Sequence, residues 1–419
     1  MPVNPAASDT VPTGSGRVLL VASNFPPVRG GSAVVYDSLA RHAADTIMVL
    51  APRLNYANGQ ELAGWREHDA AAPYKILRLP LLRSCLWHGP PPFGLARVKA
   101  RLADLALRMA ILSRLLGVIL ASRITTVCIG ELLASGWIIA CLRRIPGLRV
   151  VVYVHGEELT TDDPWDPGHR RARAAMLDAD SIVVVSRFTA EAAAALLGPE
   201  AALRIATIPN GVDLERFQPG PRRTDLQDRY GLRHGFTFVT VCRLLEKKGV
   251  DQTIRALAEL PTDCRLLVVG TGPFEPQLRA LAESCGVADA VRFAGAVAPA
   301  ELADHYRLGD VFVMPNRAMP NGDTEGFGLV FLEANACGLP VIAGQDGGSP
   351  EAVQDGVNGL VVDGHSVAAV AAAMRRLRED AVLRDRLRTG GAKVAAAADW
   401  RLKARTFLDL CRKPERHRH

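Results

Sequence analysis

Two glutamates stand eight residues apart beside a glycine-rich segment in the later half of the chain. Glu325 precedes the tripeptide 326–328 (Gly-Phe-Gly), and Glu333 lies in an apolar stretch that begins at Leu329. A helix rises about 1.5 Å per residue, so the two carboxylates would lie about 12 Å apart or less. At that distance one carboxylate could reach a sugar ring while the other reaches a ribose at the far end of a diphosphate. The backbone N–H groups of residues 326–328 would face that anion. Alternatively, Glu325 only complements the helix dipole; the apolar neighbours of Glu333 predict a buried, partnered acid.

Two cations follow the apolar run at 236–241. Arg243 and Lys248 stand five residues apart, just before a predicted helix start. The fork of an arginine, the point charge of a lysine and free backbone N–H groups all favour a diphosphate. Position alone leaves a second interpretation open, in which these cations are solvated surface charges.

Further glycine loops and one histidine stand at predicted strand ends. His155-Gly156 closes a buried strand, and Gly30-Gly31 follow the first strand at the matching position. Ligands bind at the carboxyl ends of parallel strands, which favours a functional His155 over a structural one. The GTG at 270–272 lacks the third glycine of a dinucleotide fingerprint and indicates a tight turn. The loop at 344–351 offers another helix N-terminus to an anion.

Two series of short apolar runs alternate with helical stretches and must position these residues. Continuous apolar runs are typical of parallel strands covered on both faces. We therefore predict an α/β fold with two Rossmann-like, doubly wound parallel sheets that face each other across a cleft. The expected strands are 17–23, 46–50, 126–129, 150–154 and 181–185 in the first half, and 236–241, 266–269, 291–293, 311–314 and 340–343 in the second; the expected helices include 32–45, 189–197, 250–259, 275–284, 299–308, 329–336 and 401–411.

Four segments follow from this pattern. Residues 1–16 are expected to be a disordered tail without the features of a signal peptide. We expect an N-terminal acceptor domain over 17–212 and a C-terminal donor domain over 213–395. Residues 396–419 would form a C-terminal helix that packs back on the N-terminal domain, followed by a basic tail.

Residues 102–121 form the most apolar stretch of the chain. Arg108 and Arg114 interrupt it, so we expect it not to span a membrane. One interpretation is a basic amphipathic surface in a variable acceptor region over 81–123, which includes Trp87, Phe93 and the prolines at 90–92. The other, which we favour, is a core helix whose two arginines lie on one solvated edge.

Composition excludes several classes of protein. The 419 residues are 48% hydrophobic and 22% charged with a net charge of +6, which is typical of a globular chain. No basic-aromatic strand motif accompanies the charge, so we expect no nucleic-acid partner. The eight cysteines are scattered without a Cys-x-x-Cys pair and predict reduced thiols in a cytoplasmic protein rather than a zinc site or disulfides.

Taken together, the motifs resemble the family 4 retaining glycosyltransferases of GT-B fold, the glycosyl transferases group 1. The resemblance runs from about Val18 to Asp409 and rests on R-L-x-x-x-K-G, E-x7-E within EGFGLVFLEANACGLPVIA, GGSPE, IPNGVD and the strand-ending HG. The chain is similar in its C-terminal loops to members that mannosylate phosphatidylinositol lipids. This implies a hexosyltransferase that takes a hexose from a GDP- or UDP-sugar to an acceptor hydroxyl on a glycan, lipid or natural product.

The resemblance also implies roles for individual residues. Arg243 and Lys248 would hold the donor diphosphate, Glu325 would contact the donor sugar, and Glu333 the ribose. His155 would lie near the transferred sugar. The remaining donor-binding positions would be Gly30, Gly31, Gly326, Phe327, Gly328 and Leu329. Such enzymes need no metal, and the Asp-Ala-Asp at 178–180 is expected to be a helix-end turn. The protein would be cytoplasmic, and peripheral at the inner membrane face if the 81–123 region contacts lipid.

Three alternatives remain at this point. A nucleotide-sugar epimerase would use the same donor pocket without an acceptor. A non-catalytic scaffold would keep the fold but would not need Arg243, Lys248, Glu325 and His155 together. An NAD-dependent dehydrogenase is disfavoured by the incomplete glycine fingerprint.

Overall fold

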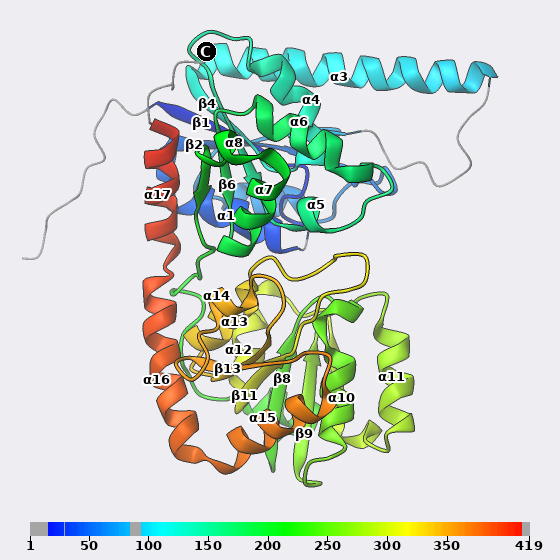
Figure 1. The fold of residues 1–419 in the computed structure, drawn as a ribbon, viewed down its shortest axis with the longest axis vertical. Coiled ribbons are helices and arrows are strands. Elements are labelled where there is room, and N and C mark those ends of the chain that lie inside the picture. Colours follow the sequence, from blue (N-terminus) through cyan, green and yellow to red (C-terminus); the bar gives the residue numbers. More distant parts are fainter. Residues whose placement is uncertain (1–15, 29, 84–93, 413–419) are drawn as a thin grey trace, which may run out of the picture.

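The computed structural model describes residues 16–28, 30–83 and 94–412. Most of the tail at 1–16, part of the 81–123 region with Trp87, Phe93 and Cys85, and the basic C-terminal tail lie outside the described residues. The described chain folds into two α/β halves stacked one above the other, and two C-terminal helices run along one side of both (Figure 1).

The N-terminal half is built on a seven-stranded parallel sheet with strand order β3-β2-β1-β4-β5-β6-β7. β2 and β5 are buried along their whole length, and β1 and β4 at all but one residue each, because helices cover both faces. The strands are β1 (Arg17–Val21), β2 (Ile47–Pro52), β3 (Ile76–Leu79), β4 (Ile124–Ile129), β5 (Arg149–Val154), β6 (Ser181–Val184) and β7 (Ile205–Thr207). The α-helices are α1 (Gly31–His42), α2 (Trp65–Ala71), α3 (Gly94–Ser122), α4 (Leu132–Leu142), α5 (Glu157–Thr160), α6 (Arg170–Asp178), α7 (Arg187–Leu197) and α8 (Pro199–Ala202).

The C-terminal half repeats the plan with a six-stranded parallel sheet of order β10-β9-β8-β11-β12-β13. The strands are β8 (Phe236–Val241), β9 (Cys264–Val269), β10 (Val291–Gly295), β11 (Val311–Met314), β12 (Val341–Gly344) and β13 (Gly359–Val362). The α-helices are α9 (Thr224–Tyr230), α10 (Val250–Leu257), α11 (Glu275–Ser284), α12 (Leu302–Arg307), α13 (Leu329–Ala336), α14 (Ser349–Ala352), α15 (Val367–Glu379), α16 (Ala381–Ala397) and α17 (Trp400–Arg412). The predicted fold class, two doubly wound parallel sheets, is confirmed.

The chain passes between the halves twice, at neighbouring points. Val212, on the first passage, donates its backbone N–H to Ala398 at 2.8 Å and pairs with Asp399 in a parallel bridge on the return passage. Helix α16 contacts α13, whereas α17 contacts α1 and accepts a hydrogen bond from Thr126 of β4 at Cys411. The C-terminal helix therefore packs against the N-terminal half.

Helix α3 differs from the core helix that we favoured. Only Ile111, Leu115, Val118 and Ile119 are buried, all in its C-terminal part. Its N-terminal part extends beyond the N-terminal half, at the end remote from the C-terminal half (Figure 1). By length and composition alone α3 is apolar enough to cross a membrane, because only two charges interrupt its most apolar window, of which 22% is buried. The core-helix interpretation is wrong, since most of the helix is not covered by the rest of the described chain.

Candidate active site

The C-terminal half contributes an ion pair between two strand-end loops. Lys248 follows β8 in a short 3-10 turn, and its ammonium contacts the carboxylate of Glu325, which precedes α13. Both side chains are largely buried, at 16% and 15% exposure. Burial alone would raise the pKa of Glu325, but the ammonium of Lys248 outweighs it and the net pKa is lowered. Glu325 is therefore ionised at neutral pH.

Helix α13 begins where the sequence predicted, and its N-terminus faces the N-terminal half. Gly328 caps it in the left-handed region, with φ of 92°. A Cβ on Gly31, at the start of α1, would lie 3.9 Å from the Leu329 side chain. A Cβ on Gly326 would collide with the carbonyl oxygen of His155. The helix-starting amides after Gly326 thus lie against the first-strand loop and the HG turn of the other half.

His155 lies at this contact between the halves, at the end of β5. Its ring stacks on Tyr153, with centroids 5.3 Å apart, and its Nε2 lies 2.8 Å from the hydroxyl of Tyr36. Burial lowers the pKa of His155 to about 4, so the ring is neutral at pH 7. His155 can therefore exchange hydrogen bonds with a ligand but adds no charge to the site.

The two neighbouring lysines have different surroundings. Lys247, which cannot be distinguished from a solvated surface charge by sequence alone, is only 6% exposed. Its ammonium contacts Asp323 at 2.6 Å and, across the halves, Glu157 at 3.1 Å. Arg243 is exposed and its guanidinium has no hydrogen-bond or ion-pair partner in the part of the chain that the structure describes. Nothing in the described part of the chain therefore occupies this guanidinium.

Glu333 is buried beside a tyrosine, as the apolar neighbours predicted. Its carboxylate accepts a hydrogen bond of 2.7 Å from Tyr306 of α12. Burial raises the pKa of Glu333. No direct contact joins it to the Lys248–Glu325 pair among the described residues, so the structure places it deeper along α13 than the other predicted donor residues.

Two further contacts join the halves, and the sequence did not predict them. Glu351, in the GGSPE loop, accepts the backbone N–H groups of Arg187 and Phe188 at 2.8 and 2.9 Å. These amides are at the N-terminus of α7, where a carboxylate is favoured. The backbone N–H of Asp162 also donates to the carbonyl of Asn321 at 2.8 Å. The sequence predicts a helix N-terminus for an anion in the loop at 344–351, whereas in the structure it is the Glu351 carboxylate of this loop that contacts the other half.

The loop after β1 is held by a buried acid. Glu131 accepts the backbone N–H groups of Ser23 and Asn24 at 2.6 and 3.0 Å. Burial raises the pKa of Glu131 to about 7. Sequence reasoning missed this residue, although it lies two residues after the end of β4, the same signal that selected His155.

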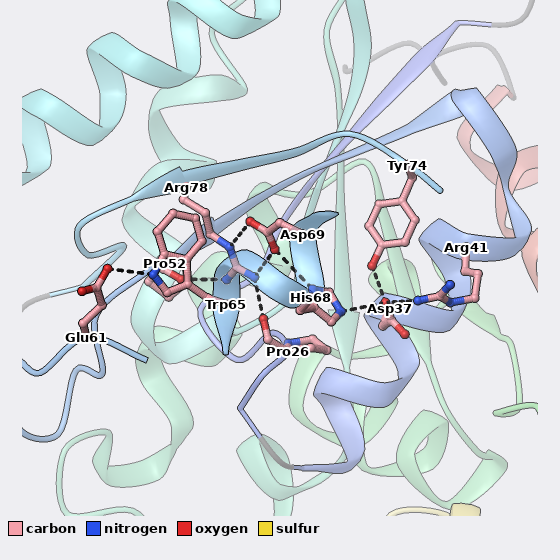
Figure 2. A network of polar contacts seen from close by, with 10 residues as sticks. All are labelled: Pro26, Asp37, Arg41, Pro52, Glu61, Trp65, His68, Asp69, Tyr74 and Arg78. Atoms are coloured by element: carbon pink, nitrogen blue, oxygen red, sulfur yellow. Dashed lines mark hydrogen bonds and ion pairs between the residues drawn. The ribbon is translucent and has the colours of Figure 1, made fainter. Parts of the chain in front are cut away.

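A polar network contacts the same loop at Pro26 (Figure 2). Arg78 donates to both oxygens of Asp69 at 2.9 and 2.7 Å and to the carbonyl of Pro26 at 2.6 Å. His68 lies between Asp69 and Asp37 of α1, at 3.2 and 3.4 Å. Burial would lower the pKa of His68, but the two carboxylates raise it overall. The network fixes both α1 and the loop that leads to Gly30 and Gly31.

The structure therefore brings most of the predicted residues together. Lys248, Glu325, the start of α13, His155 and Gly31 meet where the two halves contact each other. The Asp-Ala-Asp motif does form a helix end, since α6 stops at Asp178. Within residues 16–28, 30–83 and 94–412, no three His, Cys, Asp or Glu side chains gather as a metal site.

Comparison with solved structures defines the class of fold. Anabaena HepE in complex with UDP and glucose matches with a TM-score of 0.71 at 19% identity, covering 94% of this chain and 98% of that one. WaaG, a glycosyltransferase involved in lipopolysaccharide biosynthesis, matches with a TM-score of 0.65 at 17% identity, covering 95% and 100%. The two facing sheets are thus the GT-B glycosyltransferase fold.

Comparison with related sequences defines the family. Residues 29–216 match Glycosyltransferase Family 4, and residues 225–394 match Glycosyl transferases group 1. A GDP-mannose-dependent alpha-(1-6)-phosphatidylinositol monomannoside mannosyltransferase of Mycobacterium tuberculosis is 37% identical over 396 residues, 92% of this chain and 93% of the relative. The enzyme of the same description from Mycolicibacterium smegmatis is 36% identical over 373 residues, 87% and 89% of the two chains.

The chain belongs to glycosyltransferase family 4, the glycosyl transferases group 1. It is a retaining glycosyltransferase that uses a nucleotide-sugar donor. The predicted family resemblance and enzyme class are confirmed. The epimerase and the non-catalytic scaffold are no longer needed to explain the sequence.

Proposed function

We propose that this enzyme transfers mannose from GDP-mannose to a hydroxyl of a phosphatidylinositol mannoside. The observation that carries the proposal is the near full-length match to two enzymes named for that donor and acceptor, at 36% and 37% identity. A third relative, a GDP-mannose-dependent monoacylated alpha-(1-6)-phosphatidylinositol monomannoside mannosyltransferase of Corynebacterium glutamicum, is 28% identical over 94% of this chain and 98% of its own length.

The proposed donor site lies between the start of α13 and the HG turn. Arg243 and Lys248 neutralise the diphosphate, which takes up negative charge as the glycosidic bond breaks. The guanidinium of Arg243, exposed and without a partner among the described residues, and the position of Lys248 beside Glu325 support these roles. No metal enters this scheme, because the two cations and the helix-starting amides supply the positive charge.

The sugar and nucleoside contacts complete the proposed site. Glu325 contacts the sugar, and the amides of residues 326–329 bind sugar hydroxyls or phosphate. Gly30 and Gly31 let the first-strand loop approach the diphosphate, and Glu333 binds the ribose. Catalysis is then positional and electrostatic, with the acceptor hydroxyl held beside the anomeric carbon on the face from which the diphosphate leaves.

Helix α3 is the proposed point of contact with the membrane. Leu95, Val98, Leu102, Leu105, Met109, Leu116 and Leu120 are exposed, Leu120 to 79%. These residues are spaced by three, four or seven positions and form one apolar stripe along the helix, and the exposed Arg97, Arg101 and Lys99 flank it.

An apolar stripe with basic flanks suits the surface of an anionic phospholipid bilayer. The buried contacts of Ile111 and Leu115 with the N-terminal half favour a helix that lies on the surface over one that crosses it. We therefore propose that the enzyme is cytoplasmic and peripheral to the membrane.

The proposal is tested by measuring transfer with the purified full chain. GDP-mannose, UDP-glucose and ADP-glucose are each offered with phosphatidylinositol monomannoside in mixed micelles, and the lipid products are analysed by mass spectrometry. We expect a single added hexose with GDP-mannose alone. Transfer from a UDP- or ADP-sugar with none from GDP-mannose would overturn the donor. Turnover with free inositol phosphate in place of the lipid would overturn the acceptor.

A further inference from the structure

The hydroxyl of Tyr36 lies between two strand ends of the N-terminal sheet. Tyr36 is on α1 and is completely buried. Its hydroxyl donates to the carbonyl oxygen of Gly130, which follows β4, and lies 2.8 Å from Nε2 of His155, which follows β5. One phenol thus links the first helix to the histidine at the contact between the two halves.

The hydrogen that each group carries can be worked out from these contacts. A carbonyl oxygen only accepts hydrogen bonds, so the single hydroxyl hydrogen of Tyr36 points to Gly130. Toward His155 the phenol oxygen must then be the acceptor, and Nε2 must carry the hydrogen. A neutral imidazole has one N–H, so Nδ1 is left with a lone pair.

The rest of the surroundings of His155 agree with this tautomer. Nδ1 has no hydrogen-bond partner in the described part of the chain. It is also not a fully buried atom, unlike the hydroxyl oxygen of Tyr153. It is therefore open to a ligand. The stacked ring of Tyr153 offers no alternative partner, because its own buried hydroxyl makes no hydrogen bond with any described residue.

Gly130 is needed for this arrangement. A Cβ at position 130 would lie 2.6 Å from the Cζ of Tyr36 and 2.7 Å from its oxygen. Any larger residue would push the phenol away from the strand end and from His155. The glycine and the tyrosine therefore act as one unit.

We propose that Tyr36 is a positioning residue that fixes His155 as the Nε2–H tautomer, so that Nδ1 accepts a hydrogen bond from a hydroxyl of the bound donor sugar. This inference rests on the proposed function for the identity of the sugar, but the tautomer itself does not depend on any substrate. Tyr36 acts through His155 and need not touch the donor.

The first test reads the tautomer in the substrate-free protein. Long-range nitrogen–proton NMR on protein labelled at its ten histidines distinguishes Nε2–H from Nδ1–H, and the His155 signals are identified by their loss in His155→Gln. We expect Nε2–H in the wild type and a mixture of tautomers in Tyr36→Phe. A wild-type His155 protonated at Nδ1 would overturn the proposal, even if Tyr36→Phe did not fold.

The second test compares two substitutions that each remove one buried hydroxyl. Tyr36→Phe should lower kcat with GDP-mannose about tenfold or more while the donor KM stays within about twofold. Tyr153→Phe is the matched control, because its hydroxyl has no partner, and it should keep both the tautomer and kcat. Equal kcat in the two variants would contradict the proposal.

The two tests also separate this inference from the proposed function. If Tyr36→Phe changes the His155 tautomer and slows transfer from a sugar nucleotide other than GDP-mannose, the positioning role stands and the donor assignment fails. If the wild type uses GDP-mannose but Tyr36→Phe leaves tautomer and kcat unchanged, the function stands and the positioning role fails.

Discussion

Lys248 and Glu325 lie 77 residues apart in the chain and form a largely buried ion pair where β8 ends and α13 begins. The pair lies beside Gly326, which touches the backbone of His155 in the other half of the molecule. A buried charge pair of this kind contributes little net stability, because the cost of removing both charges from water offsets their attraction. Its position at the contact between the halves is better explained by function.

Removing either partner should therefore cost activity. We expect Lys248→Ala and Glu325→Gln each to lower kcat/KM at least about a hundredfold, since each tenfold step corresponds to about 1.4 kcal/mol of transition-state stabilisation. Steady-state kinetics with GDP-mannose measures the effect, and circular dichroism checks the fold. Lys393→Ala, an exposed lysine on α16, is the control. Wild-type turnover in Lys248→Ala would exclude the pair from the site.

The Glu351 contact should favour the closed arrangement of the two halves. Glu351→Ala removes the carboxylate from the N-terminus of α7, and the loss of such a cap costs about 1 kcal/mol. We expect the donor KM to rise several-fold with a smaller change in kcat, and small-angle X-ray scattering with GDP to show a larger radius of gyration. Glu283→Ala, on the exposed face of α11, should leave both unchanged. An unchanged donor KM in Glu351→Ala would mean that the contact does not matter for closure.

The exposed stripe of α3 should bind vesicles. We expect the triple variant Leu102→Glu, Leu105→Glu, Met109→Glu to lose cosedimentation with vesicles that contain anionic phospholipid, while its thermal unfolding stays near that of the wild type because these residues are exposed. Wild-type binding should weaken as salt is added, since the flanking arginines are screened. Val382→Glu, an exposed apolar residue on α16, is the control. Full binding by the triple variant would locate the membrane contact elsewhere.

Glu131 should make stability depend on pH. Its folded pKa of about 7 lies above the value of 4.5 expected in the unfolded chain. The folded state therefore holds a proton that the unfolded state has released, and Glu131 should reduce stability as pH rises from 4.5 to 7. The upper limit is about 3.5 kcal/mol, at about 1.4 kcal/mol per pKa unit.

Urea unfolding of wild type and Glu131→Gln at pH 5 and pH 7.5 measures this effect. We expect the free energy of unfolding of the wild type, relative to that of the variant, to be lower at pH 7.5. A difference that does not change with pH would show that the carboxyl is ionised at both values. Glu283→Gln serves as the exposed control.

Much of the fold could be predicted because most strands are continuous apolar runs. Residues 236–241 and 311–314 match β8 and β11 to the residue, and α11 and α13 also begin and end as expected. The strands β3, β7 and β13 were not predicted. They are short and lie at sheet edges, where one side of the strand is uncovered and the apolar signal is broken, as by Arg78 in β3.

A site residue could be predicted where its position next to a single strand end or helix start was enough to identify it. Lys248, Glu325 and His155 each follow or precede a recognisable element, whereas Lys247, Glu351 and Tyr36 take their importance from partners 90 or more residues away. Sequence spacing carries no information on such partners. Helix α3 was misjudged for a related reason, because apolar periodicity shows that a helix has an apolar face but not whether protein covers it.

The paired passage of the chain at Val212 and Asp399 limits how the molecule can open. Two backbone segments run side by side there and are hydrogen-bonded to each other. Helix α17 packs against the N-terminal half, where the ring of its buried Phe407 lies against Tyr153. The halves cannot slide or separate without breaking this pairing. Opening of the cleft to exchange substrate and product would therefore turn about this pairing and would break the contacts of Glu351 and Lys247 between the halves.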